Sequence, residues 1–415
     1  MRVFKFGGAS VKDADAVRNV VKVLQEVGYD NTLLVVSAMG KTTNAMEEIV
    51  NAYFKDKQAI PSKISDIVEY HNNILFELFE NKQHQIYKDF KALVDEINGF
   101  VVWNKSPNYN FVYDQIVGYG ELISTTIISA YLQEVGIGNN WLDVRNYIKT
   151  DNSYRDTTVN WEKTQKNVSN LDKKVLNITQ GFLGSDDNNF TTTLGREGSD
   201  YTAAILAYCL NADSVTIWKD VPGVLNADPR YFKETQLLNN ISYREAIELA
   251  FYGASVIHPK TLQPLQRKEI PLHVKSFLKP KDPGTTVGKG MGIEPKVPCF
   301  IVKKNQVLMK LSSLDFSFMV ENNISEIFKL FHEYKIKVDL IQNSAISFSV
   351  CVDNKFGRLE DLLQQLKSKF KVLHHEDVSL YTIRHFDTQA LESLQNGHEI
   401  LLEQRGKETV QLVVK

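Results

Sequence analysis

The apolar residues at the start of the chain follow three successive patterns, typical of a strand, a helix and a second strand. Residues 2–6 form a short apolar segment, residues 13–27 repeat apolar side chains at helical spacing, and residues 32–38 are almost continuously apolar. A continuous apolar run is typical of a parallel strand that is buried on both faces of its sheet. The pattern therefore predicts a βαβ unit and an α/β domain built on a parallel sheet.

A long stretch with helical spacing, from about residue 45 to residue 115, follows this unit, and we interpret it as a helical excursion from the sheet. Helices and strands are then expected in turn, with helices over 120–135 and 199–210 and strands over 140–144, 174–180, 213–218 and 271–277. We assign residues 1–280 to one domain on this basis.

The next segment, residues 281–298, is rich in proline and glycine and poor in apolar side chains, which indicates a linker. Short strands and helices are expected beyond it, in two βαββαβ-like clusters. The strands are expected over 299–303, 306–312, 336–341, 345–352, 371–374, 378–384, 398–404 and 408–414, and the helices over 323–334, 357–369 and 388–394. Residues 299–415 therefore predict an α+β region.

Composition removes several classes of protein from consideration. The 415 residues are 43% hydrophobic and carry a formal net charge of -2, which argues against nucleic-acid and membrane partners. The cysteines, Cys209, Cys299 and Cys351, lie too far apart for a metal-site spacing or a disulfide framework. The chain opens on an apolar strand rather than on a targeting segment. We expect a cytoplasmic protein.

Two glycine-rich segments each place a basic side chain beside a turn. Lys5 precedes Gly7 and Gly8 at the end of the first strand, and Arg196 lies in the run TTTLGREGSD (191–200). Glycine lets backbone N–H groups approach an anion closely, lysine adds a point charge, and arginine can hold a carboxylate through two hydrogen bonds. These segments suggest a phosphorylated ligand held at two points. A plain turn with a solvated lysine is the alternative for the first segment.

Further polar residues end predicted strands or open predicted helices. Ser37 ends the second strand and Thr43 opens the next helix, where hydroxyl groups could bind a carboxylate or simply cap the helix. Glu121 opens the helix over 120–135, where it could hold an ammonium group or only complement the helix dipole. Ser199 and Asp200 start the helix over 199–210 and could cap it.

The segment WKDVPGVLNADPR (218–230) follows a predicted parallel strand. Ligands of open α/β sheets bind at loops beyond the carboxyl ends of the strands. Lys219 and Arg230 are therefore candidates for contacts with nucleotide phosphates, and a turn-rich connection is the alternative.

Together these segments resemble the aspartate kinases of the amino-acid kinase superfamily, over essentially the whole chain. The resemblance rests on KFGGASV (5–11), SAMGKTTN (37–44), GELIST (120–125), GFLGS (181–185), TTTLGREGSDYTAA (191–204), WKDVPGVLNADPR (218–230) and GASVIHPKTL (253–262). It implies a three-layer αβα amino-acid kinase domain, of the carbamate-kinase-like type, followed by α+β, ferredoxin-like ACT regulatory domains. Two ACT modules are implied in residues 299–415, the first (about 306–375) inserted in the second.

The resemblance implies transfer of the γ-phosphoryl group of ATP, with Mg²⁺, to the β-carboxylate of L-aspartate. The product is 4-phospho-L-aspartate, which leads to lysine, threonine and methionine. The implied catalytic residues are Lys5, Arg196 and Asp200. The implied substrate-binding residues are Ser37, Thr43, Glu121, Phe182, Arg196 and Ser199. The implied nucleotide-binding residues are Lys5, Gly7, Gly8, Lys219, Asp220, Leu225 and Arg230, with Mg²⁺ held by the phosphates and not by a protein metal site.

The resemblance also implies an amino-acid effector in the ACT modules and a homodimer or higher homo-oligomer. The implied effector residues are Ser317, Met319, Asn323, Ile324, Val338 and Asp339. Asn323 and Ala345 stand where lysine-sensitive members tend to have an aromatic and an acidic residue. The effector is therefore left open between lysine and threonine.

Several positions depart from the family pattern. Ser255 stands where a basic residue is common, and Lys260 is the candidate to replace that base. Glu197 replaces a glycine near the phosphates, and Leu225 stands where an aromatic residue is common. We expect a monofunctional kinase because no dehydrogenase domain follows the ACT modules.

Two other functions remain open at this point. One is a relative that phosphorylates glutamate, acetylglutamate or a nucleoside monophosphate, and the other is a weakly catalytic amino-acid sensor. The pairing of Arg196 with Glu121 favours an acceptor that carries both charges.

Overall fold

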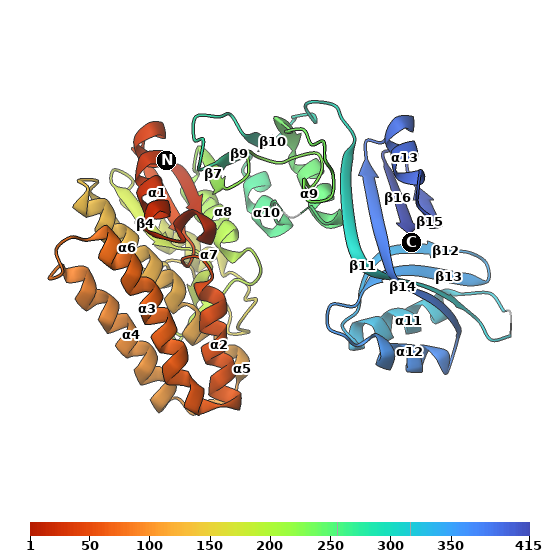
Figure 1. Ribbon diagram of the computed structural model, residues 1–415, viewed down its shortest axis with the longest axis horizontal. Helices are drawn as coiled ribbons and strands as arrows, with labels where there is room; N and C mark the ends of the chain where they lie inside the picture. The colour runs from red at the N-terminus through yellow and green to blue at the C-terminus, as the bar shows by residue number, and fades with distance from the viewer. Residues whose placement is uncertain (255, 316) are drawn as a thin grey trace. The chain divides into compact units, whose positions relative to one another are not determined.

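The computed structural model describes residues 1–254, 256–315 and 317–415. The chain divides into two compact units, whose helices and strands are labelled in Figure 1. The first consists of Met1–Val224, Leu237–Ile247 and Val256–Ile293, and the second of Leu225–Gln236, the segment that begins at Glu248, and Glu294–Lys415. None of the helices described here combines the length and the apolar character needed to cross a membrane. The cytoplasmic location stays a prediction.

The first unit is built on a sheet whose eight described strands follow the order β3-β4-β2-β1-β7-β9-β10-β8. Its strands are β1 (Arg2–Phe6), β2 (Thr32–Val36), β3 (Asn139–Leu142), β4 (Leu176–Gln180), β7 (Ser214–Lys219), β8 (Asn240–Ser242), β9 (Leu272–Ser276) and β10 (Thr285–Gly288). Neighbouring strands are parallel except β9 and β10. The βαβ start and the parallel sheet expected from the apolar pattern are confirmed.

Helices lie on both faces of this sheet: α1 to α6 share an apolar core on one face, and α8 contacts β1, β2 and β7 on the other. The helices of the unit are α1 (Ala14–Val27), α2 (Thr42–Lys55), α3 (Ile60–Leu78), α4 (Gln85–Trp103), α5 (Tyr109–Val117), α6 (Tyr119–Glu134), α7 (Trp161–Val168), α8 (Gly198–Leu210) and α10 (Pro259–Arg267), and α9 (Tyr243–Tyr252) begins in this unit and ends in the second. Helices α2 to α5, drawn in orange shades in Figure 1, occupy the stretch for which a helical excursion was expected.

The pleat of β1 decides which side chains reach which face. Phe4 and Phe6 pack into the apolar core shared with helices α1 to α6. Because successive side chains of a strand point to opposite faces, Lys5 between them projects to the other face, where α8 contacts β1. The strand therefore fixes the direction of this lysine.

The expected linker over 281–298 is partly wrong, because residues 285–288 form β10 inside the main sheet. Thr285 and Val287 are fully buried, and β-branched residues fit a pleated, buried surface well. The proline and glycine residues around this short strand hide it in the sequence pattern. The pattern also missed a small hairpin of β5 (Leu183–Ser185) and β6 (Thr191–Thr193), which supports the glycine-rich turn before α8.

The second unit holds an antiparallel sheet whose six described strands follow the order β12-β13-β11-β14-β16-β15. Its strands are β11 (Cys299–Ser312), β12 (Lys337–Asn343), β13 (Ser347–Asp353), β14 (Lys371–Arg384), β15 (Ile400–Arg405) and β16 (Thr409–Val414), and its helices are α11 (Glu321–Glu333), α12 (Leu359–Lys367) and α13 (Thr388–Gln395). These elements are drawn from teal to blue in Figure 1.

Two pairs of short strands expected in this unit are single long strands. The expected strands over 299–303 and 306–312 are one strand, β11, and those over 371–374 and 378–384 are one strand, β14. The pairing of β11 with β14 shifts register between Lys303 and Gln306, where Asn305 has a φ of 56°. A β-bulge allows the pairing of β11 with β14 to continue through a polar segment whose sequence resembles a turn. The apolar cores on either side of the bulge are separate clusters, which fits the expected α+β class.

Candidate substrate and phosphoryl-transfer site

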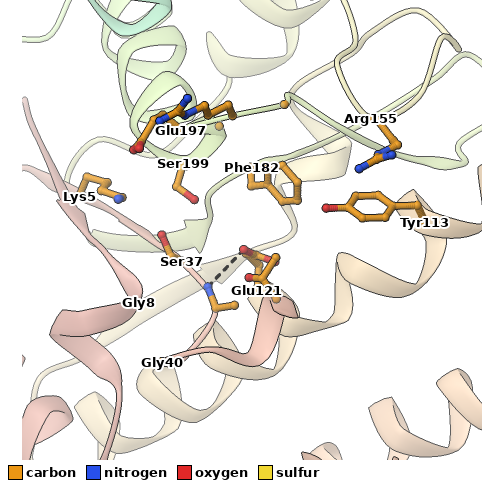
Figure 2. Close-up of a pocket in the computed structure, with 15 residues that line it drawn as sticks. Lys5, Gly8, Ser37, Gly40, Tyr113, Glu121, Arg155, Phe182, Glu197 and Ser199 are labelled. Atoms are coloured by element: carbon orange, nitrogen blue, oxygen red, sulfur yellow. Dashed lines mark hydrogen bonds between the residues drawn. The ribbon is translucent and has the colours of Figure 1, made fainter. Parts of the chain in front are cut away.

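The ends of β1, β2 and β4 and the starts of α2, α6 and α8 surround one pocket of about 420 Å³ in the first unit. Figure 2 shows its lining side chains converging from these elements. The sequence-predicted site residues that line it are Lys5, Gly8, Ser37, Thr43, Glu121, Phe182, Arg196 and Ser199. Residues scattered over nearly 200 positions of the chain therefore meet at the carboxyl edge of the parallel sheet, where α/β proteins bind ligands.

Lys5 and Asp200 are buried, oppositely charged residues at this edge. The Lys5 Nζ lies 2.6 Å from Asp200 Oδ1, and the Lys219 Nζ lies 3.7 Å from Asp200 Oδ2. Burial opposes ionisation of Asp200, but the charges of Lys5 and Lys219 outweigh it and hold the pKa of this carboxyl below its usual value. Asp200 is thus a fixed negative charge that holds the ammonium group of Lys5 at the pocket wall.

Helix α8 presents its N-terminus to the pocket without a side-chain cap from the described residues. Glu197 is its N-cap residue and has a φ of 55°, and its side chain is exposed and lines the pocket. The capping role considered for Ser199 and Asp200 is therefore not what the structure shows. Ser199 can approach the end of β4 only because residue 181 is glycine, since a Cβ there would lie 2.4 Å from the Ser199 Cβ. The free N–H groups and positive dipole of such a helix end favour an anion.

The turn after β1 allows similarly close contact with the loop after β2. A Cβ on Gly8 would lie 2.9 Å from the carbonyl oxygens of Ala38 and Gly40. The simple capping role of Thr43 is also excluded, because Lys41 is the N-cap residue of α2 and no described side chain caps this helix. Thr43 instead lines the pocket, and Thr42 donates a hydrogen bond to the Met39 carbonyl at 2.7 Å.

Glu121 is a buried carboxyl group in the first turn of α6. Its Oε1 accepts a hydrogen bond from the Ala38 N–H at 3.3 Å, drawn dashed in Figure 2. Its Oε2 has no hydrogen-bond partner within the described residues. Burial raises the pKa of Glu121 to about 8, although the Ala38 N–H and the charge of Lys5 oppose this shift. A buried, unsatisfied carboxyl group beside a pocket is suited to binding a cation.

The residues expected to bind the nucleotide are only partly gathered here. Gly7 lies next to Lys5, since a Cβ on it would be 3.3 Å from the Lys5 Nζ. Lys219 reaches Asp200 and donates a hydrogen bond to the Val256 carbonyl at 2.6 Å, and Asp220 is exposed. Leu225 and Arg230 belong to the second compact unit, where the guanidinium group of Arg230 pairs with Asp228 at 2.6 Å.

Two further residues bear on the basic residue that is common in the family and is replaced by serine in this chain. Ser255 lies outside the described residues. Lys260, the candidate replacement, forms an ion pair with Asp156. Within the described ranges, no three histidine, cysteine, aspartate or glutamate side chains are grouped as a metal site.

Two pocket residues, Tyr113 and Arg155, lie outside every motif singled out in the sequence. Tyr113 lies on α5, in the helical excursion that had been given no part in the site. Arg155 lies in the loop between residues 150 and 157 and has a φ of 63°, an unusual conformation for a residue other than glycine. The sequence around it (DNSYRDTT) carries no motif, so the only available signal was the extra positive charge.

The expected effector residues lie around the start of α11 and on β12 in the second unit. The Asp339 side chain is buried and pairs with Lys303 at 2.8 Å and Lys337 at 3.1 Å. The Asn323 Oδ1 accepts a hydrogen bond from the Val320 N–H at 3.1 Å. Met319 is buried, Ile324 and Val338 are half-buried against the same core, and Ser317 is exposed. Their effector role stays a prediction.

Comparison with known proteins now decides the family. Residues 1–276 match the model of the amino acid kinase family. The chain is 33% identical over 351 residues to lysine-sensitive aspartokinase 3 of Escherichia coli K12, covering 82% of this chain and 76% of that protein. The chain belongs to the aspartokinases of the amino acid kinase family.

The fold agrees with this membership over the whole chain. The structure of E. coli aspartokinase III in complex with aspartate and ADP has a TM-score of 0.81 to this one at 29% identity, covering 100% of this chain and 96% of that one. The three-layer kinase domain and the ACT-like second unit are therefore confirmed as fold class. Some family members are longer, and the chain spans 43% of a 31% identical bifunctional aspartokinase/homoserine dehydrogenase of Buchnera aphidicola.

Proposed function

We propose that this protein is an aspartate kinase that transfers the γ-phosphoryl group of ATP to the β-carboxylate of L-aspartate. The observation that carries the proposal is the charge arrangement of the pocket. A buried carboxyl group, Glu121, faces the same space as the cationic groups of Lys5 and Arg196. An acceptor with one ammonium and two carboxylate groups matches this set, whereas a nucleoside monophosphate carries no ammonium group for Glu121. The E. coli relative, whose structure contains aspartate and ADP, supports the same acceptor and nucleotide.

The main task of the pocket residues is to align the two reactants and to neutralise their negative charge. Transfer of a proton is not required. A carboxylate is already a nucleophile at neutral pH, so its oxygen attacks the γ-phosphorus while the bond to the departing ADP oxygen breaks. Lys5 lies where its positive charge can offset the charge that spreads over the phosphoryl oxygens, with Asp200 holding it in place. The uncapped N-terminus of α8 and the Gly7-Gly8 turn supply N–H donors for the phosphates.

These features fit the phosphate end of a nucleotide. Mg²⁺ held by the ATP phosphates would supply further charge neutralisation there. The adenosine end is assigned to Lys219, Asp220, Leu225 and Arg230 on the family resemblance alone.

The binding of the substrate's ammonium group beside Glu121 can be tested through the protons that are released. In the free protein the pKa of Glu121 is about 8, so the group is mostly protonated at pH 7. An ammonium group bound beside it favours the ionised form. We expect aspartate binding at pH 7 to release close to one proton, measured by titration calorimetry in buffers of different ionisation enthalpy.

The matched variant for this test is Glu121→Gln, which keeps the shape of the side chain. It is expected to bind aspartate more weakly and without proton release. If proton release persists unchanged in the variant, the proton comes from another group and the role of Glu121 is contradicted.

Arg196 is the residue to test for the hold on a substrate carboxylate. Replacing it by alanine removes a charged, two-pronged hydrogen-bond donor, so we expect the KM for aspartate to rise at least about tenfold. Initial rates of ADP release at varied aspartate concentration give this value, with Arg18→Ala, an exposed arginine on α1, as the control. An unchanged KM for aspartate in Arg196→Ala would contradict the assignment.

The product identifies the acceptor group. An acyl phosphate reacts with hydroxylamine, so trapping during turnover should yield aspartate β-hydroxamate. The α-hydroxamate, or no hydroxamate at all with ADP still released, would contradict transfer to the β-carboxylate.

Control by an amino acid is part of this proposal. The E. coli relative is described as lysine-sensitive, and the second unit has the ACT-like fold. We therefore expect lysine or threonine to bind the second unit and change the rate of the first. The homodimer also stays a prediction, to be measured by light scattering.

A further inference from the structure

The glycine turn that follows β1 and the loop that follows β2 are held tightly together at the pocket. The Gly40 N–H donates a hydrogen bond to the Gly8 carbonyl at 3.1 Å, and a Cβ on Gly8 would lie 2.9 Å from the carbonyl oxygen of Gly40. Figure 2 shows Gly8 and Gly40 next to each other, and both line the pocket. Because the two segments are in direct contact, a group that fixes one of them also fixes the other.

Tyr70 on α3 contacts both segments through its hydroxyl group, although it is not itself a lining residue of the pocket. The hydroxyl donates a hydrogen bond to the carbonyl of Lys12, the C-cap residue of the short 3₁₀ helix Gly8–Val11. A Cβ on Gly40 would lie 2.6 Å from the same hydroxyl oxygen, so the end of the phenol group lies directly against the Gly40 backbone. One polar atom from the helical excursion thus joins the turn after β1 to the loop after β2.

The ring of Tyr70 is fixed by apolar packing. It packs against the core that α1 to α6 share, and it meets the His71 ring edge-on with 4.9 Å between the ring centres. Burial raises the pKa of the Tyr70 hydroxyl, and the charge of Asp13 adds to this shift, so the group remains a protonated donor at neutral pH. A tyrosine hydroxyl that is partly withdrawn from water needs a hydrogen-bond partner, and here the partner is the Lys12 carbonyl.

His71, the next residue on α3, supports the same loop from within the core. It is fully buried, its Nδ1 lies 2.8 Å from the Ile67 carbonyl oxygen, and its Nε2 lies 3.5 Å from the Thr42 hydroxyl oxygen. Burial lowers the pKa of His71 to about 4, so the ring is neutral at pH 7. The Thr42 hydroxyl in turn donates to the Met39 carbonyl at 2.7 Å. Two neighbouring residues of α3 therefore support the loop that contains Gly40.

We propose that Tyr70 is a positioning residue for phosphoryl transfer, whose hydroxyl group holds the Gly7-Gly8 turn in the place where it receives the phosphates of the nucleotide. This inference rests on the proposed function, which assigns the N–H donors of that turn to the phosphates. Tyr70 acts through the backbone of Lys12 and Gly40 rather than by contact with a reactant. Neither the motifs nor the family resemblance gives it a role.

Tyr70→Phe tests this role because it removes only the hydroxyl group and leaves the packing of the ring. The matched control is Tyr87→Phe. Tyr87 is also half-buried against the core of α1 to α6, and its hydroxyl donates to the Leu75 carbonyl at 3.3 Å and the Phe79 carbonyl at 3.4 Å, both within the helical excursion. Each variant loses one tyrosine hydroxyl from the same core, but Tyr70→Phe alone releases the segments beside the pocket.

We expect Tyr70→Phe to weaken the binding of ADP with Mg²⁺, measured by titration calorimetry, about three- to tenfold, which is the effect of losing one hydrogen bond that orders a binding turn. The KM for ATP should rise by a similar factor, because the phosphates then meet a turn that is no longer held in place. The KM for aspartate should stay within about twofold, since Glu121 and Arg196 lie on other elements, α6 and the turn before α8. Tyr87→Phe should match the unaltered protein in all three constants, and the two variants should unfold at similar temperatures.

Unchanged ADP binding and an unchanged KM for ATP in Tyr70→Phe would overturn the inference and leave the proposed function standing. Equal losses for ATP and aspartate, together with a lower unfolding temperature than that of Tyr87→Phe, would also overturn it, because they indicate a general loosening of the fold. If the unaltered protein binds ADP but does not turn over aspartate, the proposed function fails, and the calorimetric comparison of the two variants still decides the role of Tyr70.

Discussion

Replacing Lys5 by methionine is expected to lower turnover about 10²–10³-fold, with the KM for aspartate changed only a few-fold. The ammonium group of Lys5 is 2.6 Å from Asp200 and lines the pocket beside the glycine turn. Its charge matters most when negative charge spreads over the phosphoryl group in the transition state, and methionine keeps the length of the side chain without that charge. Steady-state ADP release at saturating and at varied aspartate separates the two constants.

The control for this variant is Lys12→Met, which removes an exposed lysine of the next turn. It should behave like the unaltered protein. Normal turnover in Lys5→Met, with only nucleotide affinity reduced, would show that Lys5 binds the ground state and has no special role in the transfer.

Asp200→Asn is expected to lower the free energy of unfolding of the first unit by about 3 kcal/mol, the lower end of the range for breaking a buried ion pair. The change leaves the charge of Lys5 in a buried place without its partner. Since the pKa of Asp200 is held below its usual value, its stabilising charge is complete above the pKa of an unfolded aspartate and is lost as the pH falls through the lowered value. The free energy of unfolding that Asp200→Asn removes should therefore be lost in full at neutral pH.

Tryptophan fluorescence during denaturation isolates this effect, because the four tryptophans, Trp103, Trp141, Trp161 and Trp218, all lie in the first unit. The double variant Lys5→Met with Asp200→Asn should recover most of the stability and remain as inactive as Lys5→Met alone. Additive losses of stability in the double variant would mean that the two residues do not stabilise each other.

Site residues could be predicted best from the sequence where a polar residue lies at the end of a regular strand or helix. Strand periodicity placed Lys5 at the end of β1, and the pleat then directs it to the face of α8. Glu121 could be placed in the first turn of a helix, but its burial and raised pKa depend on packing against the loop of Ala38. Such packing leaves no periodic signal in the sequence.

Other features could not be read from local pattern for different reasons. Arg155 adopts a left-handed backbone that local sequence does not favour, and the hydrogen bonds that hold it come from Asp114, 41 positions away. The strands β11 and β14 run through polar segments that resemble turns, because a bulge absorbs the irregularity. In both places tertiary contacts override local preference.

The most direct test of the proposed kinase activity is the release of ADP from ATP and Mg²⁺ by the purified protein with a panel of acceptors: L-aspartate, L-glutamate, N-acetylglutamate and uridine monophosphate, each with and without lysine or threonine. We predict turnover with aspartate alone, and a change of that rate on addition of one of the two amino acids. Turnover with another acceptor of the panel, or binding of amino acids without any turnover, would contradict an aspartate kinase under amino-acid control.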